Sequence, residues 1–187
     1  MSEDPILIAG GGVAGLTLAL TCHQLGVPVR VFESTRELRP LGVGINIQPN
    51  AVRELIDLGL GDRLPEIGVA TQEYGFFTKH GKEIWNEPRG LEAGYSWPQY
   101  SVHRGELQLM LHDAVVDRLG SEAIQLGSRV TGYVNDGDSV RLQFEVNGEA
   151  TEVSGPLVVA ADGLHSAIRA QMVPDEGPPI WGGAILW

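Results

Sequence analysis

The sequence predicts an α/β fold in which a parallel sheet is combined with an antiparallel β-meander, and three observations predict it. Residues 6–32 contain two short apolar runs separated by a glycine-rich turn and a helical stretch, which is the order of a β-α-β unit. Residues 140–146 alternate strictly between apolar and polar side chains before an Asn147-Gly148 turn signal, which predicts a hairpin. Residues 157–161 form a continuous apolar run, as expected for a strand buried on both faces of a parallel sheet.

The amino-terminal unit is typical of Rossmann-like dinucleotide binding. Its predicted elements are a strand at 6–9, a turn with the spacing G-x-G-x-x-G (Gly10, Gly12 and Gly15, with Val13 and Ala14 between them), a helix at 16–25 ended by Gly26, and a strand at 29–32.

Each part of this unit has a role in binding a dinucleotide. Gly10 permits the tight turn, Gly12 lets the backbone approach a pyrophosphate, and Gly15 lets the helix pack close to the sheet. The helix N-terminus presents free N–H groups to the phosphates. Glu33 lies eighteen residues after Gly15 and ends the second strand, where an acid binds a ribose hydroxyl. The alternative is a glycine turn that binds no ligand. In that case the backbone entropy that the glycines lose on folding would not be offset by ligand binding.

The middle of the chain departs from a simple NAD-binding domain. A glycine-containing loop at 39–47 leads into an extended segment, and a helix starts at Pro49 and is closed by Gly59 and Gly61. Two strands at 74–78 and 82–85 surround a His80-Gly81 turn, and residues 86–99 are predicted to be irregular.

The second half supplies a long helix and the meander. The predicted elements are a helix at 104–119, strands at 124–126, 130–134, 140–146, 151–153 and 157–161, a helix at 166–172, a linker at 174–179 and a strand at 181–187 that stops mid-course. The meander replaces a crossover helix of the parallel sheet.

Composition narrows the class of protein. The 187 residues carry a net charge of −11, which argues against nucleic acid or an anionic membrane as a partner. Cys22 is the single cysteine, so no intramolecular disulfide is possible, which fits a reducing compartment. No apolar stretch approaches the roughly 20 residues that span a bilayer, and the acidic start is unlike a signal peptide. We therefore expect a cytoplasmic protein. No cluster of His and Cys has the spacing of a metal site.

Three motifs resemble those of the FAD-dependent aromatic hydroxylases, the group A flavoprotein monooxygenases. They are the glycine motif with Glu33, the run from Asp162-Gly163 to Arg169 that looks like the family's D-G-x-x-S-x-x-R element, and His103-Arg104-Gly105-Glu106-Leu107 at the start of the long helix. Within the family, residues 42–49, 87–90 and 100–108 look like the bacterial phenazine-modifying hydroxylases that act on 5-methylphenazine-1-carboxylate.

The resemblance implies an oxidoreductase that uses FAD, NADH or NADPH, and O₂ to hydroxylate a small aromatic, phenazine-like or salicylate-like substrate. Because the flavin carries the chemistry, no catalytic side chain is expected. The cofactor-binding residues it implies are Gly10, Gly12, Val13, Ala14, Gly15, Glu33, Ser34, Val43, Gly44, Arg104, Val130, Asp162, Gly163 and Arg169.

Several of these residues keep a second, structural interpretation. Arg104 suits the FAD phosphate and ribityl region or a surface ion pair, and Asp162 suits a ligand or the cap of a turn. Arg169 assists the reduced pyridine nucleotide or holds Asp162. Val43-Gly44 approaches the flavin or forms a tight turn, and Val130 packs near the adenine or in the core. The aromatic residues Trp85, Tyr95, Trp97 and Tyr100 line a pocket or pack ordinarily.

The resemblance also implies a domain division. Residues 1–73 and 101–175 form the FAD-binding domain, 74–100 are an excursion belonging to the substrate domain, and 176–187 start an incomplete substrate-domain portion. The family's second flavin motif, G-D-A-A-H with a following proline, has no counterpart here, so the chain looks like the first half of a longer enzyme. A catalytically inert dinucleotide-binding fragment and an NAD-dependent dehydrogenase are the alternatives. An open sheet edge near Trp187 favours self-association.

Overall fold

The computed structural model describes residues 4–183, which form two compact units. The first unit contains Met1–Glu37 and Ala114–Trp187, and the second contains Leu38–Asp113. Helix α4 (Arg104–Leu119) continues from the second unit into the first. None of the described helices has the length and apolar character needed to cross a membrane.

The first unit is built around a four-stranded parallel sheet. Its order is β12-β1-β2-β8, and every neighbouring pair is parallel. These strands are β1 (Ile6–Ala9), β2 (Val29–Phe32), β8 (Ile124–Gln125) and β12 (Val158–Ala160), and the helix after β1 is α1 (Val13–Gln24). The predicted α/β class and parallel sheet are confirmed.

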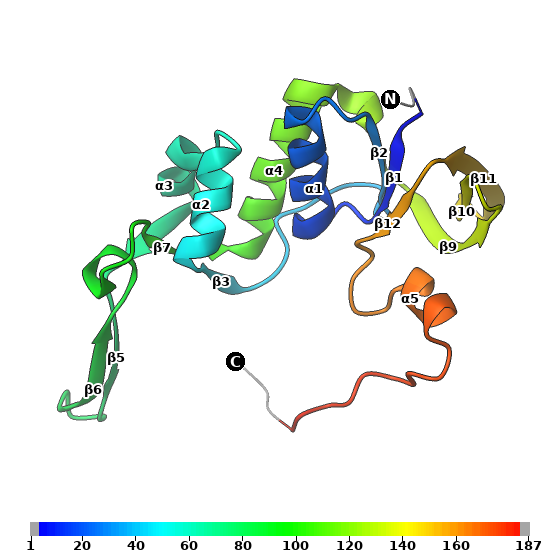
Figure 1. Ribbon diagram of the computed structural model, residues 1–187. Coiled ribbons are helices and arrows are strands. Elements are labelled where there is room, and N and C mark those ends of the chain that lie inside the picture. The colour runs from blue at the N-terminus through cyan, green and yellow to red at the C-terminus, as the bar shows by residue number, and fades with distance from the viewer. Residues whose placement is uncertain (1–3, 184–187) are drawn as a thin grey trace. The chain divides into compact units, whose positions relative to one another are not determined.

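The two faces of the parallel sheet are covered by different elements. Successive side chains of a strand point to opposite faces, so Leu7 and Ala9 face one side and Ile8 faces the other. Leu7 and Ala9 pack with Phe144 in a buried cluster that joins the sheet to the meander. Helix α1 packs against β1 and β2 on the other face, where Gly15 lies next to Ile8. Figure 1 shows α1 and the meander on opposite sides of β1.

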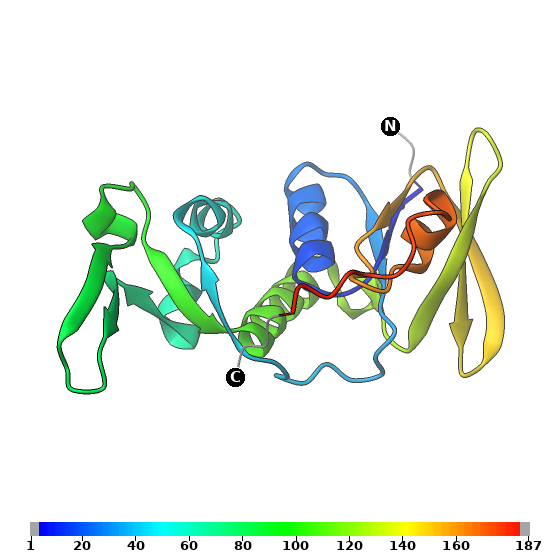
Figure 2. The same cartoon turned by 90° about the horizontal axis from the view of Figure 1, so that it is seen from below.

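The meander and the last helix complete this unit. The meander strands are β9 (Ser128–Asn135), β10 (Val140–Val146) and β11 (Glu149–Gly155), paired antiparallel in the order β11-β10-β9. Asn147 and Gly148 have φ values of 54° and 85°, which confirms the predicted type I′ turn. Helix α5 (Ala167–Met172) lies beside β9, as Figure 2 shows, and the Gln171 side chain bonds both backbone groups of Tyr133.

The second unit contains a small sheet, two helices and a hairpin. The sheet has the order β3-β7-β4, all antiparallel. The elements are β3 (Gly44–Ile47), α2 (Pro49–Asp57), the 3₁₀ helix η1 (Gly61–Arg63), α3 (Leu64–Ile67), β4 (Gly68–Thr71), β5 (Glu73–Phe77), β6 (Glu83–Pro88), the 3₁₀ helix η2 (Gly90–Ala93) and β7 (Gln99–His103). A third 3₁₀ helix, η3 (Ser121–Ala123), precedes β8 in the first unit.

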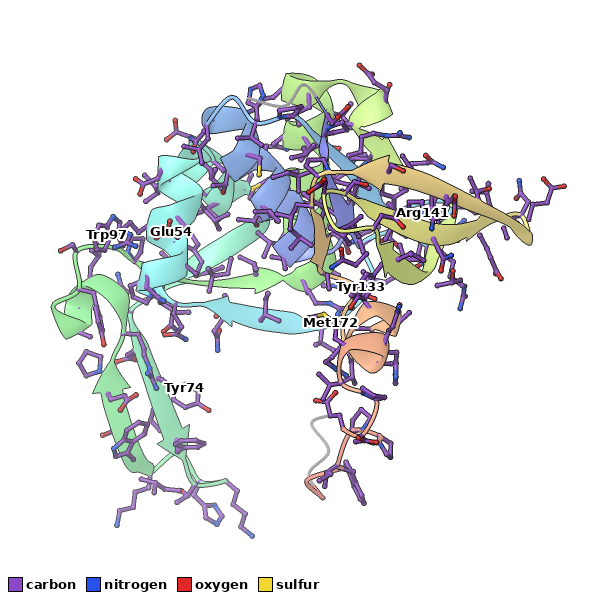
Figure 3. The ribbon with its side chains drawn as sticks, turned by 45° about the vertical axis from the view of Figure 1, so that its right-hand side comes forward. Glu54, Tyr74, Trp97, Tyr133, Arg141 and Met172 are labelled. Carbon is purple, nitrogen blue, oxygen red and sulfur yellow. The ribbon has the colours of Figure 1, made fainter. Side chains whose placement is uncertain are left out.

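Aromatic side chains of the β5–β6 hairpin contact one another at the protein surface. Tyr74, Phe76 and Trp85 have ring centroids 5.1 to 6.2 Å apart, although each is more than two-fifths exposed. Figure 3 labels Tyr74 on the projecting β5–β6 hairpin and Trp97, whose ring lies beneath the Arg53 guanidinium. Trp85 and Trp97 therefore both make ordinary surface packing contacts.

Several element bounds differ from the sequence-based expectation, and α3 and β4 were not expected. The first helix starts at Val13 rather than at 16, and β9 begins at Ser128 rather than at 130. Residues 86–99 are not irregular throughout, because β6 continues to Pro88, η2 follows and β7 begins at Gln99. Residues 181–183 are not in a strand, and the rest of the predicted strand and its edge near Trp187 lie outside the described residues.

Candidate functional site

A cavity of about 480 Å³ lies at the carboxyl end of the parallel sheet in the first unit. Residues that follow each of the four strands line it. Ala161 to Gly163 follow β12, Gly10 and Gly12 follow β1, Glu33 and Ser34 follow β2, and Ser128 to Val130 come shortly after β8. Ligands of open α/β sheets bind at this edge. The remaining lining residues are Phe32, His165 and Ala167.

Close packing around the glycine turn shapes one wall of the cavity. Gly10 has a φ of 104°, and a Cβ there would overlap the carbonyl group of Ala161. A Cβ on Gly15 would overlap the Gly10 carbonyl oxygen, so only glycine lets α1 come this close to the turn. Gly12 is the residue before α1, and a Cβ on it would meet nothing within 4 Å. The cavity side of Gly12 is therefore open space at a helix N-terminus, whose first amides lack intrahelical acceptors.

Glu33 is held rigidly under the glycine turn. Its side chain is 8 % exposed, and Oε2 accepts a hydrogen bond of 2.7 Å from the Gly11 amide. Oε1 accepts bonds from the Thr35 amide at 2.8 Å, the Thr35 hydroxyl at 3.0 Å and the Ser34 hydroxyl at 3.1 Å. Among residues 4–183, Oε2 has one hydrogen-bond donor, which leaves a lone pair for a further donor. This is the geometry that a ribose hydroxyl needs.

The two carboxylate oxygens of Asp162 have different surroundings. Oδ2 accepts from the Ala167 amide at 2.9 Å and so caps α5 together with Ser166, whose hydroxyl accepts from the Arg169 amide at 2.9 Å. Oδ1 is buried and has no hydrogen-bond partner within the described residues. An unpaired buried carboxylate oxygen beside a cavity is an acceptor that a ligand hydroxyl can satisfy.

Arg169 does not hold Asp162, contrary to one of the two expectations for it. Its guanidinium donates a 2.7 Å bond to the Leu164 carbonyl and lies 2.8 Å from Glu176. The side chain therefore braces the loop between β12 and α5, while backbone amides of α5 hold the Asp162 carboxylate. Arg169 does not line the cavity.

Val130 has the packing that its core interpretation expects, and its position near an adenine stays a prediction. It packs against the buried cluster that contains Phe32 and Phe144, and it also lines the cavity. Ser34 lines the cavity as well, whereas Val13 and Ala14 do not.

Ser128 and Arg129 line the cavity but were not predicted from the sequence. The Ser128 amide donates a 2.8 Å bond to the Glu33 carbonyl, so this segment runs directly beside Glu33. Ser128 is fully buried, and its hydroxyl has no partner in the part of the chain that the structure describes. Their position just after a parallel strand is the signal that could have found them.

The other expected cofactor residues belong to the second unit. The Arg104 amide donates to the Val43 carbonyl at 3.1 Å, and Gly44 pairs with His103 across β3 and β7. The Arg104 guanidinium lies over Gly42, where a Cβ would come within 2.7 Å of its Nε. The loop before β3 is thus packed onto the first residue of α4.

No group of three His, Cys, Asp or Glu side chains with the geometry of a metal site occurs in residues 4–183. The cavity carries two carboxylates, Glu33 and Asp162, and one guanidinium, Arg129.

Comparisons with known proteins identify relatives of this chain. A phenazine 1,6-dicarboxylic acid hydroxylase of Lysobacter antibioticus is 46 % identical over 179 residues, covering 94 % of this chain and 44 % of that protein. An aurachin C monooxygenase/isomerase of Stigmatella aurantiaca is 35 % identical, covering 97 % and 46 %. A salicylate hydroxylase of Pseudomonas putida is 32 % identical, covering 91 % and 38 %. This chain therefore spans less than half the length of these relatives.

Solved structures share the fold. The Klebsiella pneumoniae protein HpxO, complexed with FAD and uric acid, superposes with a TM-score of 0.74 at 28 % identity, covering 91 % of this chain and 42 % of that one. A p-nitrophenol 4-monooxygenase from Pseudomonas putida gives a TM-score of 0.81 at 20 % identity, with coverage of 90 % and 43 %, which is a likeness of fold. The FAD binding domain family matches residues 3–177, and this chain therefore belongs to that family.

Proposed function

We propose that this chain binds FAD and forms the amino-terminal part of a monooxygenase that hydroxylates a small aromatic substrate with NAD(P)H and O₂. The observation that carries the proposal is the convergence of the glycine turn, the buttressed Glu33 and the half-satisfied Asp162 on one cavity. Relatives named as hydroxylases of phenazine and salicylate support the substrate class, because each covers more than nine-tenths of this chain.

Different cavity residues bind different parts of FAD. The amides at the start of α1 take the pyrophosphate, because a helix N-terminus favours negative charge and Gly12 leaves room for it. The free lone pair of Glu33 accepts from the adenosine ribose, and Asp162 Oδ1 accepts from a hydroxyl of the ribityl chain. FAD when bound supplies the redox chemistry with oxygen, and the protein contributes binding, orientation and exclusion of water.

The residues of the second unit enter the proposal through the family resemblance. We assign Arg104 to the phosphate and ribityl region, and Val43 and Gly44 to the flavin. The exposed start of α4, where Arg104 lies, and the open surface at Val43 support this assignment. We assign Arg169 to the binding of the reduced pyridine nucleotide.

The domain division is part of the same proposal. Residues 1–73 and 101–175 serve the cofactor, 74–100 belong with the substrate domain, and 176–187 begin its next portion. The existence of a separate compact unit that includes 74–100 supports an excursion distinct from the parallel-sheet unit. The buried free thiol of Cys22 is compatible with a cytoplasmic, reducing location.

A second candidate is a dinucleotide-binding chain that does not turn over by itself. The observation that favours it is that the matched region covers 44 % of the phenazine hydroxylase. Flavin binding is common to both candidates, and turnover separates them.

Calorimetric titration of the purified chain with FAD tests the binding step. Gly12→Val provides a selective block, because its backbone φ of −78° suits any residue and its side chain would extend only into the cavity. Gly182→Val is the matched control, since a Cβ there also meets nothing within 4 Å and Gly182 lies outside the cavity. We expect FAD to bind the unaltered chain and the control but not Gly12→Val. Equal binding by all three would remove the cavity as the site.

Turnover is then measured on the FAD-loaded chain as NADH or NADPH oxidation with and without a phenazine carboxylate or salicylate. Oxidation stimulated by the aromatic compound supports the monooxygenase. FAD binding without any stimulated oxidation supports the inert alternative, and binding of NAD without FAD supports a dehydrogenase.

A further inference from the structure

The four parallel strands present their cavity residues in a fixed spatial order. From one side of the sheet to the other, Asp162 follows β12, the glycine turn follows β1, Glu33 follows β2, and Ser128 to Val130 come after β8. Neighbouring strands lie about 4.8 Å apart, so the line from β12 to β8 is about 14 Å long. A ligand that occupies the whole edge must be extended and must match this order.

The covalent order of FAD matches it in one direction only. The pyrophosphate belongs at the glycine turn and the adenosine ribose belongs at Glu33, one strand away. The adenine is attached to the far side of that ribose, so it continues to the next position, which is the segment after β8. The hydrogen bond from the Ser128 amide to the Glu33 carbonyl fixes this segment next to the ribose acid.

Arg129 is the one arginine or lysine among the cavity-lining residues. Its side chain is exposed, and it forms no ion pair within residues 4–183. Glu145 stands opposite it in the β9–β10 pairing. A guanidinium is planar and stacks on aromatic rings, which an ammonium cannot do in the same way.

Resting on the proposed function, we propose that Arg129 lies against the adenine ring of the bound dinucleotide and sets the preference for an adenine dinucleotide over a mononucleotide flavin. The fully buried Ser128 hydroxyl, unpartnered in the described chain, is a further polar group on the same nucleoside wall. Arg129 is thus a binding residue that acts on affinity and ligand choice.

The test measures FAD, ADP and FMN binding by calorimetry with three variants. Arg129→Gln removes the guanidinium, and Arg129→Lys keeps the charge but loses the planar face. Arg141→Gln is the matched control, because Arg141 is on the neighbouring strand, pairs with Asp136 and Glu152, and lies outside the cavity. Figure 3 labels Arg141 on the meander.

We expect Arg129→Gln to weaken FAD and ADP by about 5- to 10-fold and to leave FMN unchanged. Arg129→Lys should show most of the same loss of FAD and ADP affinity, and Arg141→Gln should bind these ligands like the unaltered chain. Unchanged FAD affinity in Arg129→Gln overturns the inference, as does full rescue by lysine or an equal loss for FMN, since both would assign Arg129 to a phosphate. If the unaltered chain binds neither FAD nor ADP, the proposed function falls as well.

Discussion

Glu33 gives the sharpest test of how the site is built, because the same carboxylate is a structural acceptor and the proposed acceptor for the ribose. Glu33→Ala removes the acceptor of the Gly11 amide at 2.7 Å and of the Thr35 amide at 2.8 Å. Both amides then lose the acceptor that Glu33 provides. Glu33→Gln keeps the side-chain shape and one acceptor oxygen, but its NH₂ group faces one of the two donors.

The magnitude follows from those two bonds. A buried donor without an acceptor costs about 1–3 kcal/mol. Gly11 is buried, whereas Thr35 is exposed and its amide can bond water, so Glu33→Ala should lower the free energy of unfolding by about 1–3 kcal/mol. Glu33→Gln can keep the Gly11 bond by turning its NH₂ group toward the exposed Thr35, so its cost should be below about 1 kcal/mol. The first loss is a notable share of the roughly 5–15 kcal/mol that stabilises a typical domain.

Urea unfolding followed by circular dichroism measures the stability, and amide hydrogen exchange of Gly11 reports the bond itself. Glu149→Ala is the control, since Glu149 is an exposed glutamate on β11. We expect stability to fall in the order control, Glu33→Gln, Glu33→Ala, with loss of Gly11 protection in the last. A loss below about 1 kcal/mol for Glu33→Ala, with Gly11 still protected, would refute the reasoning.

Two other predictions separate structural from ligand roles. Asp162→Ala and Ser166→Ala each remove an acceptor at the start of α5 and should each cost about 1 kcal/mol in urea unfolding, but only Asp162→Ala should also weaken FAD in calorimetry. Equal FAD affinity in the two variants would contradict a ligand role for Oδ1. Burial raises the pKa of the Cys22 thiol. The stability that the buried neutral thiol contributes is therefore fully present below the pKa of Cys22 in the unfolded chain, and it is lost as the pH rises through the pKa of Cys22 in the folded chain. An aromatic disulfide reagent at pH 8 should therefore label Cys22 far more slowly in the folded chain than in urea, and equal rates would show that the thiol is accessible.

Elements with a strong local pattern could be predicted from the sequence. Helix α4 begins at Arg104 and ends at Leu119, and β10 covers 140–146, as the periodicity indicated. The turn at Asn147 needs only a local signal, because positive φ values at two successive positions select Asn and Gly. The link between the glycine turn and Glu33 was also predictable, because a β-α-β unit brings the ends of adjacent parallel strands together.

Strand pairing over long distances was not predictable in the same way. Strand β7 lies between β3 and β4, and its segment has no clear alternation of apolar and polar residues that would predict these distant partners. Arg129 entered the site for a similar reason, since only the addition of β8 next to β2 brings residue 129 to the edge that Glu33 occupies.

The sequence by itself determined the class of fold and the glycine–glutamate part of the site, because these depend on residues within one local unit. The tertiary structure decided which oxygen of Asp162 has no hydrogen-bond partner in the described chain and which residues line the cavity wall beside Glu33. Both depend on hydrogen bonds between segments far apart in the chain, and the geometry of those bonds is fixed only when the sheet assembles.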